Sequence, residues 1–242
     1  MPRVHVPTGP KQNRLLAALP PADYEHLLPH LEVVHMPLGW VVYESGGVQG
    51  HEYFPVNCIV SLLSVMENGA SAELAVVGNE GMVGISLFMG GDTTPSRAVV
   101  QSAGHAYRAP ASILKMEFAR GGELQRLSLR YTQALITQMA QTTVCNRYHS
   151  VDQQLCRWLL LSMDRLQGNE IQMTQELVAD MLGVQREAVA GVVEVLQAAE
   201  LFHYSRGHFT ILDRPGLEKR VCECYRVVKT EYQRLLPETA AN

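Results

Sequence analysis

The sequence predicts an α+β protein: an amino-terminal antiparallel β-barrel or jelly roll, a long helix, and a carboxy-terminal winged helix-turn-helix with an extra carboxy-terminal helix. Three observations predict this order. Short apolar runs alternate with glycines over residues 31–109. An uninterrupted helical pattern follows at 123–149, and two helices precede a hairpin at 175–213.

Composition limits the class of protein. A chain of 242 residues with 47% hydrophobic content can bury one large core or two ordinary ones. The net charge of −4 and the pI near 6.1 argue against non-specific coating of nucleic acid, although a local basic patch remains compatible with them. Five cysteines without a CxxC pair predict reduced thiols. No run resembles a signal peptide or a membrane span, so we expect a cytoplasmic protein without a membrane partner.

The first half has the pattern of short strands. Runs such as EVVHM, WVVYE, CIVSLLSV and AELAVVG are apolar or alternating, and glycines separate them. Strands of this length and spacing are typical of an antiparallel barrel or jelly roll.

The long helix carries an apolar stripe, and no glycine or proline interrupts it. A long helix between two domains is a natural dimer seam, and we expect a homodimer through it. The alternative is that the stripe packs only against its own barrel. The stripe consists of Leu124, Leu127, Tyr131, Leu135 and Met139.

The segment 175–213 predicts DNA binding. A first helix, QELVADMLGV, has the small Ala179 where two helices cross, and Gly183 supplies a turn residue with positive φ. A second helix at 186–200 has its inner face at Val189 and Val192, so its first turn can enter a major groove. The alternating run at 201–213 is centred on Arg206-Gly207 and predicts a hairpin. A helix pair that only packs a core is the alternative.

Barrel, long helix and winged helix in this order resemble the Crp/Fnr family of bacterial transcription regulators over about residues 12–214. The most specific segments are VVGNEGMVGISLFMGG with SRAVVQSAG at 76–104, and the helix-turn-helix. The resemblance implies 12–122 as a cyclic-nucleotide-binding-like effector domain, 123–149 as a dimerisation helix, 150–215 as the DNA-binding domain and 216–237 as the additional helix.

In this family, a glycine-rich turn and an arginine hold the phosphate of a cyclic nucleotide, because oriented amides and a guanidinium form an anion site. The turn and the arginine match, but Met82 stands where cyclic-AMP binders have a glutamate, and Ala98 replaces a hydroxyl. Met139 and Ala140 fall where purine-facing hydroxyls are expected. Each loss costs roughly 1–3 kcal/mol, so we expect an effector other than cyclic AMP, or none. The implied effector positions are Gly81, Met82, Val83, Gly84, Arg97, Ala98 and Met139.

The resemblance also implies the DNA contacts. Arg186 and Glu187 match an arginine–glutamate pair that can recognise guanine and cytosine, whereas Gly191 replaces a later arginine. Gln185 stands where a serine cap is usual. The expected DNA-binding residues are Thr174, Gln185, Arg186, Glu187, Ala190, Arg206 and His208. The partners are a double-stranded operator and a second copy of the chain, with RNA polymerase and a small-molecule effector as further candidates.

The last helix, at 216–237, places six residues on one stripe that must be buried. Within one helix Cys222 and Cys224 would point apart, and neither the other cysteines nor the barrel histidines have a ligand spacing, so the sequence predicts no metal and no cofactor. Without paired carboxylates or a nucleophile elbow, no enzyme is expected. Two alternatives remain: a metal-dependent cupin-type enzyme, to which His51-Glu52 is the nearest approach, and an interaction protein that has lost DNA binding. The stripe consists of Leu217, Val221, Cys224, Val228, Tyr232 and Leu235.

Overall fold

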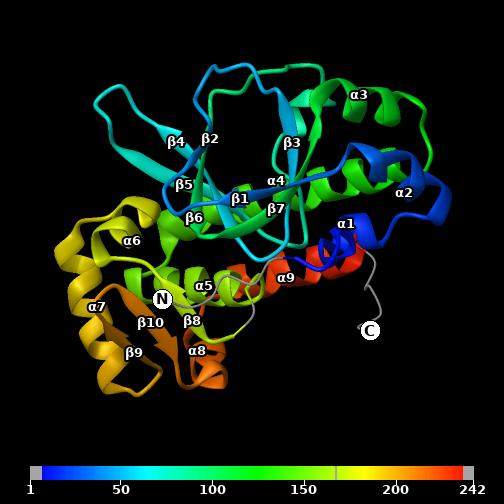
Figure 1. The fold of residues 1–242 in the computed structure, drawn as a ribbon. Helices are drawn as coiled ribbons and strands as arrows, with labels where there is room; N and C mark the ends of the chain where they lie inside the picture. Colours follow the sequence, from blue (N-terminus) through cyan, green and yellow to red (C-terminus); the bar gives the residue numbers. More distant parts are fainter. Residues whose placement is uncertain (1–6, 167, 237–242) are drawn as a thin grey trace.

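The computed structural model describes residues 7–166 and 168–236. Two antiparallel sheets form the amino-terminal half (Figure 1). The first has the order β1-β7-β3 and the second the order β2-β6-β4-β5. The strands are β1 Glu32–Met36, β2 Val41–Tyr43, β3 His51–Pro55, β4 Ile59–Val65, β5 Ser71–Val77, β6 Arg97–Ser102 and β7 Gly104–Pro110.

The two sheets share one hydrophobic core, with side chains such as Phe54, Leu62 and Val100 facing inward. They remain separate sheets and do not close into a single barrel. The predicted antiparallel architecture is therefore confirmed, with an open form. Short helices precede and interrupt it: η1 Pro10–Gln12, α1 Arg14–Ala17, α2 Pro21–Leu27, η2 Leu28–His30 and η3 Ile85–Leu87.

After α3 (Ala111–Ala119), the long helix α4 extends over Glu123–Tyr148, close to the expected 123–149. Its apolar stripe is not a free seam, because Tyr131 and Leu135 are buried in the core of their own sheets. Leu124 and Leu127 are buried in the same core, and Met139 packs against it. The expectation that this stripe joins two protomers is therefore wrong, because the stripe is already buried against the sheets of its own protomer.

The carboxy-terminal half begins with α5 (Val151–Met163), which Ser150 and Gln153 start with a capping box. The helix-turn-helix follows as α6 (Gln175–Leu182) and α7 (Arg186–Ala198). The hairpin consists of β9 (Phe202–Ser205) and β10 (His208–Ile211). A third strand that the sequence pattern did not indicate, β8 (Glu170–Gln172), pairs with β10 and completes the sheet β8-β10-β9.

The end of the chain corrects one expectation. The single helix predicted at 216–237 is two helices, α8 (Arg214–Arg220) and α9 (Glu223–Leu235); residue 237 lies outside the described residues. Val221 and Cys222 have extended backbones, with ψ of 152° and 165°, and they separate the helices. Cys222 therefore precedes α9, and the i, i+2 geometry that was expected to keep it apart from Cys224 does not apply.

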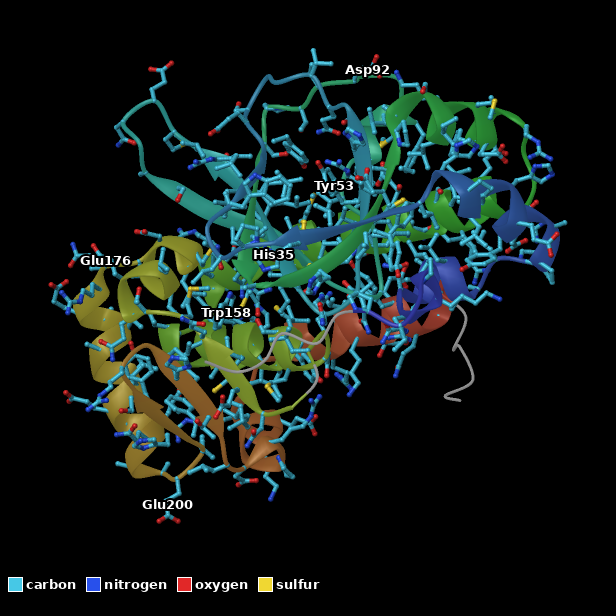
Figure 2. The ribbon with its side chains drawn as sticks, in the orientation of Figure 1. His35, Tyr53, Asp92, Trp158, Glu176 and Glu200 are labelled. Carbon is cyan, nitrogen blue, oxygen red and sulfur yellow. The ribbon has the colours of Figure 1, made fainter. Side chains whose placement is uncertain are left out.

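The two halves pack closely against each other. Trp158 of α5 shares a core with Ile59 and Val76 of the four-stranded sheet, and Figure 2 shows it between the sheets and the helix-turn-helix. A buried ion pair also joins the halves, with 2.7 Å between Arg165 Nε and Glu80 Oε1. Helix α9 lies alongside α4 (Figure 1). No helix among the described residues is long and apolar enough to span a membrane.

Candidate nucleic-acid interface

A short loop between α6 and α7 leaves the first helical turn of α7 exposed to solvent. Gly183 ends α6 in the left-handed conformation, with φ of 67°, as predicted. The Val184 N–H then donates to the Ala179 carbonyl, and two residues later α7 begins. Gln185, Arg186 and Glu187 are exposed. This arrangement leaves three polar side chains at a helix amino terminus, where a nucleic-acid groove can receive them.

The opposite face of α7 holds the helix in place. Val189, Val193 and Leu196 are buried in the carboxy-terminal core, and Val192 packs against this core. Ala179 of α6 is 3% exposed, which fits a small residue where the two helices cross. The predicted inner face is thus correct in position, with Val193 and Leu196 added to it.

Beyond the first turn, α7 presents small side chains. Ala190 is half-buried, and Gly191 is exposed with no heavy atom within 4 Å of a Cβ placed there. Gln185 makes no side-chain cap hydrogen bond to α7, so its amide remains available for an external partner. Within residues 185–191, the exposed polar side chains that could reach base edges are therefore those of residues 185–187.

The wing tip lies next to the start of α6. Arg206 and Gly207 have φ of 49° and 79° and form the two-residue turn, with Ser205 opposite His208. The Met173 N–H donates to the Gly207 carbonyl, and a Cβ on Gly207 would lie 3.6 Å from the Thr174 methyl. The structure therefore places the exposed Arg206, the half-buried His208 and the exposed Thr174 on adjoining loops.

Thr174 has a structural role as well. Its hydroxyl oxygen accepts from the Leu177 N–H at 3.2 Å and caps α6. The hydroxyl proton remains free to donate, so the same side chain can cap the helix and meet a phosphate oxygen.

The charge of this surface is unusual for a nucleic-acid interface. Residues 170–213 contain Arg186 and Arg206 as the only lysine or arginine residues, against seven carboxylates. Figure 2 shows two of these carboxylates, Glu176 and Glu200, directed outward from the helices. Since phosphate neutralisation by Lys and Arg governs the salt dependence of binding, this surface can make few such contacts.

The glycine-rich turn of the first half has a different environment. Met82, Val83 and Ala98 are each at most 1% exposed and lie in the hydrophobic core. A Cβ on Gly81 would lie 2.4 Å from Tyr131 Cε2, and one on Gly84 would lie 2.7 Å from Glu52 Oε2. Side chains of α4 and β3 therefore fill the space beside this turn.

Glu52 is fully buried, and neither carboxylate oxygen has a hydrogen-bond partner among the described residues. Burial raises the pKa of Glu52 well above its usual value, because a charged carboxylate is disfavoured away from water. Arg97 pairs instead with Glu44, with Nε 3.0 Å from Oε2. Met139 packs partly against the core. The effector role implied for these residues stays a prediction.

An exposed face of α4 escaped sequence reasoning. Leu129, Ile136 and Val144 are 53%, 55% and 43% exposed, and Ala140 is exposed between them. Spacings of seven and four residues place them on one side of the helix. The signal was present in the sequence, but the more hydrophobic stripe of the same helix concealed it.

Comparison with known proteins supports the assignment of the helix-turn-helix in the carboxy-terminal half. Residues 153–220 match the model of the Crp-like helix-turn-helix domain. None of the curated proteins matches the chain.

Three solved structures show the likeness of the whole fold. A regulator assigned to the Crp/Fnr family from Eubacterium rectale ATCC 33656 has a TM-score of 0.65 at 18% identity, covering 89% of this chain and 99% of its own. FixK2 from Bradyrhizobium japonicum has a TM-score of 0.66 at 14% identity, covering 79% and 98%. The c-di-GMP-responsive global regulator CLP from Xanthomonas campestris has a TM-score of 0.59 at 18% identity, covering 79% and 99%.

At these identities the structural likeness establishes the fold, and the domain match adds the class of DNA-binding element. The chain thus combines a Crp-like helix-turn-helix domain at residues 153–220 with the overall fold of the Crp/Fnr transcription regulators.

Proposed function

We propose that the chain binds, as a homodimer, an operator made of two half-sites, and that Gln185, Arg186 and Glu187 recognise base edges. The observation that carries this proposal is the first turn of α7, where these three side chains are exposed while the back of the helix is buried. Arginine can hold guanine O6 and N7, and glutamate can accept from cytosine N4. Transcription regulators act by binding, so no catalytic role is assigned.

The loops beside α7 hold the backbone of the operator in this proposal. Arg206 and Thr174 contact phosphates, with His208 next to them, and Ala190 approaches the groove without a polar contact. With only two arginines per protomer in residues 170–213, the affinity should depend weakly on salt. We expect a slope of log K against log[salt] of about −2 to −4 for the dimer.

The exposed face of α4 supports the dimer. Leu129, Ile136, Ala140 and Val144 follow one side of a 26-residue helix, and this face has the pattern of a coiled-coil seam. Two recognition helices held by one seam match two half-sites one helical turn apart. The division into 12–122, 123–149, 150–215 and 216–237 is part of the same proposal.

The first half acts as a scaffold or takes an effector other than cyclic AMP. The side chains of Tyr131 and Glu52 occupy the space beside the glycine-rich turn, and Glu44 pairs with Arg97; both observations support this choice. A cytoplasmic location and contact with RNA polymerase follow as expectations for an operator-binding protein.

Selection of bound DNA from a random pool tests the proposal, with wild type and Arg186→Ala in parallel. The wild type should enrich a sequence with two-fold symmetry. Arg186→Ala should lose about 10–100-fold affinity for that sequence and relax one base position in each half-site. Arg206→Ala is the matched control, since loss of a phosphate contact weakens all sequences alike. Unchanged affinity and preference for Arg186→Ala would show that α7 is not the recognition helix.

A further inference from the structure

Four potential metal ligands gather where α4 ends and α8 meets α9. Cys145 lies in the last turn of α4, His149 follows that helix directly, and Cys222 and Cys224 lie at the start of α9. Their ligand atoms all lie within 4.8 Å of one another. The three cysteines are buried and free, and the His149 side chain is 15% exposed.

The spacing of these atoms fits a single metal ion. Cys145 Sγ lies 3.6 Å from Cys222 Sγ, and Cys224 Sγ lies 3.6 Å from His149 Nδ1. A tetrahedral zinc ion with Zn–S bonds of about 2.3 Å and Zn–N bonds of about 2.0–2.1 Å separates its ligand atoms by about 3.5–3.8 Å. An iron–sulfur cluster places iron and sulfide ions between its cysteines and needs wider spacing.

We propose that Cys145, His149, Cys222 and Cys224 bind one Zn²⁺ ion in a closed, structural Cys₃His site. Four protein ligands leave no open position for a reacting group, which separates this site from a catalytic one. On binding, the three thiols lose their protons and their thiolates bond to the metal.

Groups around the cluster support this assignment. Glu223 Oε2 lies 3.4 Å from His149 Nε2, so the carboxylate can orient the ring with Nδ1 toward the metal. Arg157 is 3% exposed, and its Nε has no hydrogen-bond partner among the described residues. Three thiolates and one Zn²⁺ carry a net charge of −1, which the positive charge of this buried guanidinium, an electrostatic neighbour of Cys145 and Cys224, can balance.

The site would fasten the joint between the two halves of the chain. Cys145 lies in the last turn of α4, and His149 directly follows the end of α4 and lies two residues before α5 begins. Gln154 Nε2 donates to the His149 carbonyl at 2.9 Å across this corner. The other two ligands come from the far end of the carboxy-terminal half. A metal ion there would hold the helix-turn-helix at a fixed angle to α4, and only this consequence rests on the proposed function.

Metal analysis of the full-length protein, purified under reducing conditions, tests the site without any DNA. We expect about one zinc ion per protomer in the wild type. Cys222→Ser and His149→Gln should lose it. Cys58→Ser and Cys156→Ser are the controls: both cysteines are buried and free, and Cys58 lies in the sheet core, where serine can keep the hydrogen bond to the His105 carbonyl. Both controls should retain zinc.

Cobalt substitution of the wild type keeps the test decisive if the variants fail to fold. Co²⁺ should give tetrahedral ligand-field bands and a thiolate-to-cobalt charge-transfer band, and a chelator should abolish both and lower the melting temperature. A protein without stoichiometric metal, a cobalt spectrum without thiolate bands, or a disulfide between Cys145 and Cys222 would overturn the site. Operator selection on the same sample reports separately on DNA binding.

Discussion

Two glycine-containing turns of this molecule carry the patterns from which binding sites were predicted, and they differ in what surrounds them. The turn at 183–187 leaves Arg186 and Glu187 in solvent. The turn at 81–84 has the glycines of an anion site, but Met82 is 1% exposed and the Tyr131 ring covers Gly81. A backbone turn can therefore persist while side chains fill its binding space. Exposure of the side chains, more than the glycine pattern, decides where this chain can meet a ligand.

Removing α8 and α9 should have the largest effect of the changes predicted here. These two helices contribute more buried side chains to the carboxy-terminal core than to the core of the first half. Truncation after Arg214 removes Leu217, Tyr225 and Val228 from the carboxy-terminal core. Among the described residues, the first half loses Leu236 from its own core, along with the packing of Tyr232. Burial of such side chains contributes about 1.5–3 kcal/mol each. We expect aggregation, or a melting temperature lower by about 10 °C or more, measured by calorimetry.

The truncated sample also tests the alternative that α8 and α9 form a docking arm for another protein. In that case it would stay soluble and equally stable, with full operator affinity. All six residues of the predicted stripe are buried or half-buried against the protomer, which favours the structural role.

A charge introduced into the proposed dimer seam should have the next largest effect. Ile136→Asp places a charge at the centre of the exposed face of α4, where a partner helix would have to bury it. We expect monomers in sedimentation analysis and operator affinity lower by at least about 100-fold, since one half-site is lost. Met89→Asp changes a similarly exposed side chain in the loop after η3 of the first half and should do neither. Dimers of Ile136→Asp would place the seam elsewhere.

The sequence predicted the features that depend on local patterns of residues, and it missed those that depend on contacts between residues far apart in the chain. Gly183, the two-residue turn at Arg206 and the long helix are local patterns, and each was placed correctly. The break at Val221 has no proline or glycine to announce it, so one helix was expected where there are two. Cys145 and Cys222 are 77 positions apart, and the fold that brings them together cannot be read from their spacing along the chain.

A buried carboxyl between the two halves gives a pH-dependent effect. Burial raises the pKa of Glu73 from 4.5 to about 7, although a hydrogen bond from Ser61 and the nearby Arg157 and Arg165 oppose the shift. Because the folded-state pKa is above the unfolded one, stability should fall as pH rises from about 4.5 to about 7. Glu73→Gln should remove this loss and be stabilised relative to wild type by about 1–3 kcal/mol at pH 8, and less at pH 5. Urea unfolding at both pH values measures it.

The matched control is Glu176→Gln, which removes one exposed carboxylate from α6. Equal stability changes for both variants at both pH values would contradict the prediction, because a general charge effect would then explain them.

The smallest expected effect is that of cyclic AMP, for which we predict no saturable heat in calorimetry at millimolar concentration. A phosphate at the 81–84 turn would have to displace the Tyr131 ring, which is fully buried. It would also lie next to Glu52, a buried carboxyl without a hydrogen-bond partner among the described residues, and it would have to draw Arg97 away from Glu44. These costs add to the ligand hydroxyls left without partners, at roughly 1–3 kcal/mol each. The titration needs protein shown to be active on its selected operator, so that a missing signal reports on the site. Micromolar binding of cyclic AMP that raised operator affinity would contradict this prediction. It would mean that Tyr131 can move away from the turn at 81–84, so that this turn, like the one at 183–187, can be accessible.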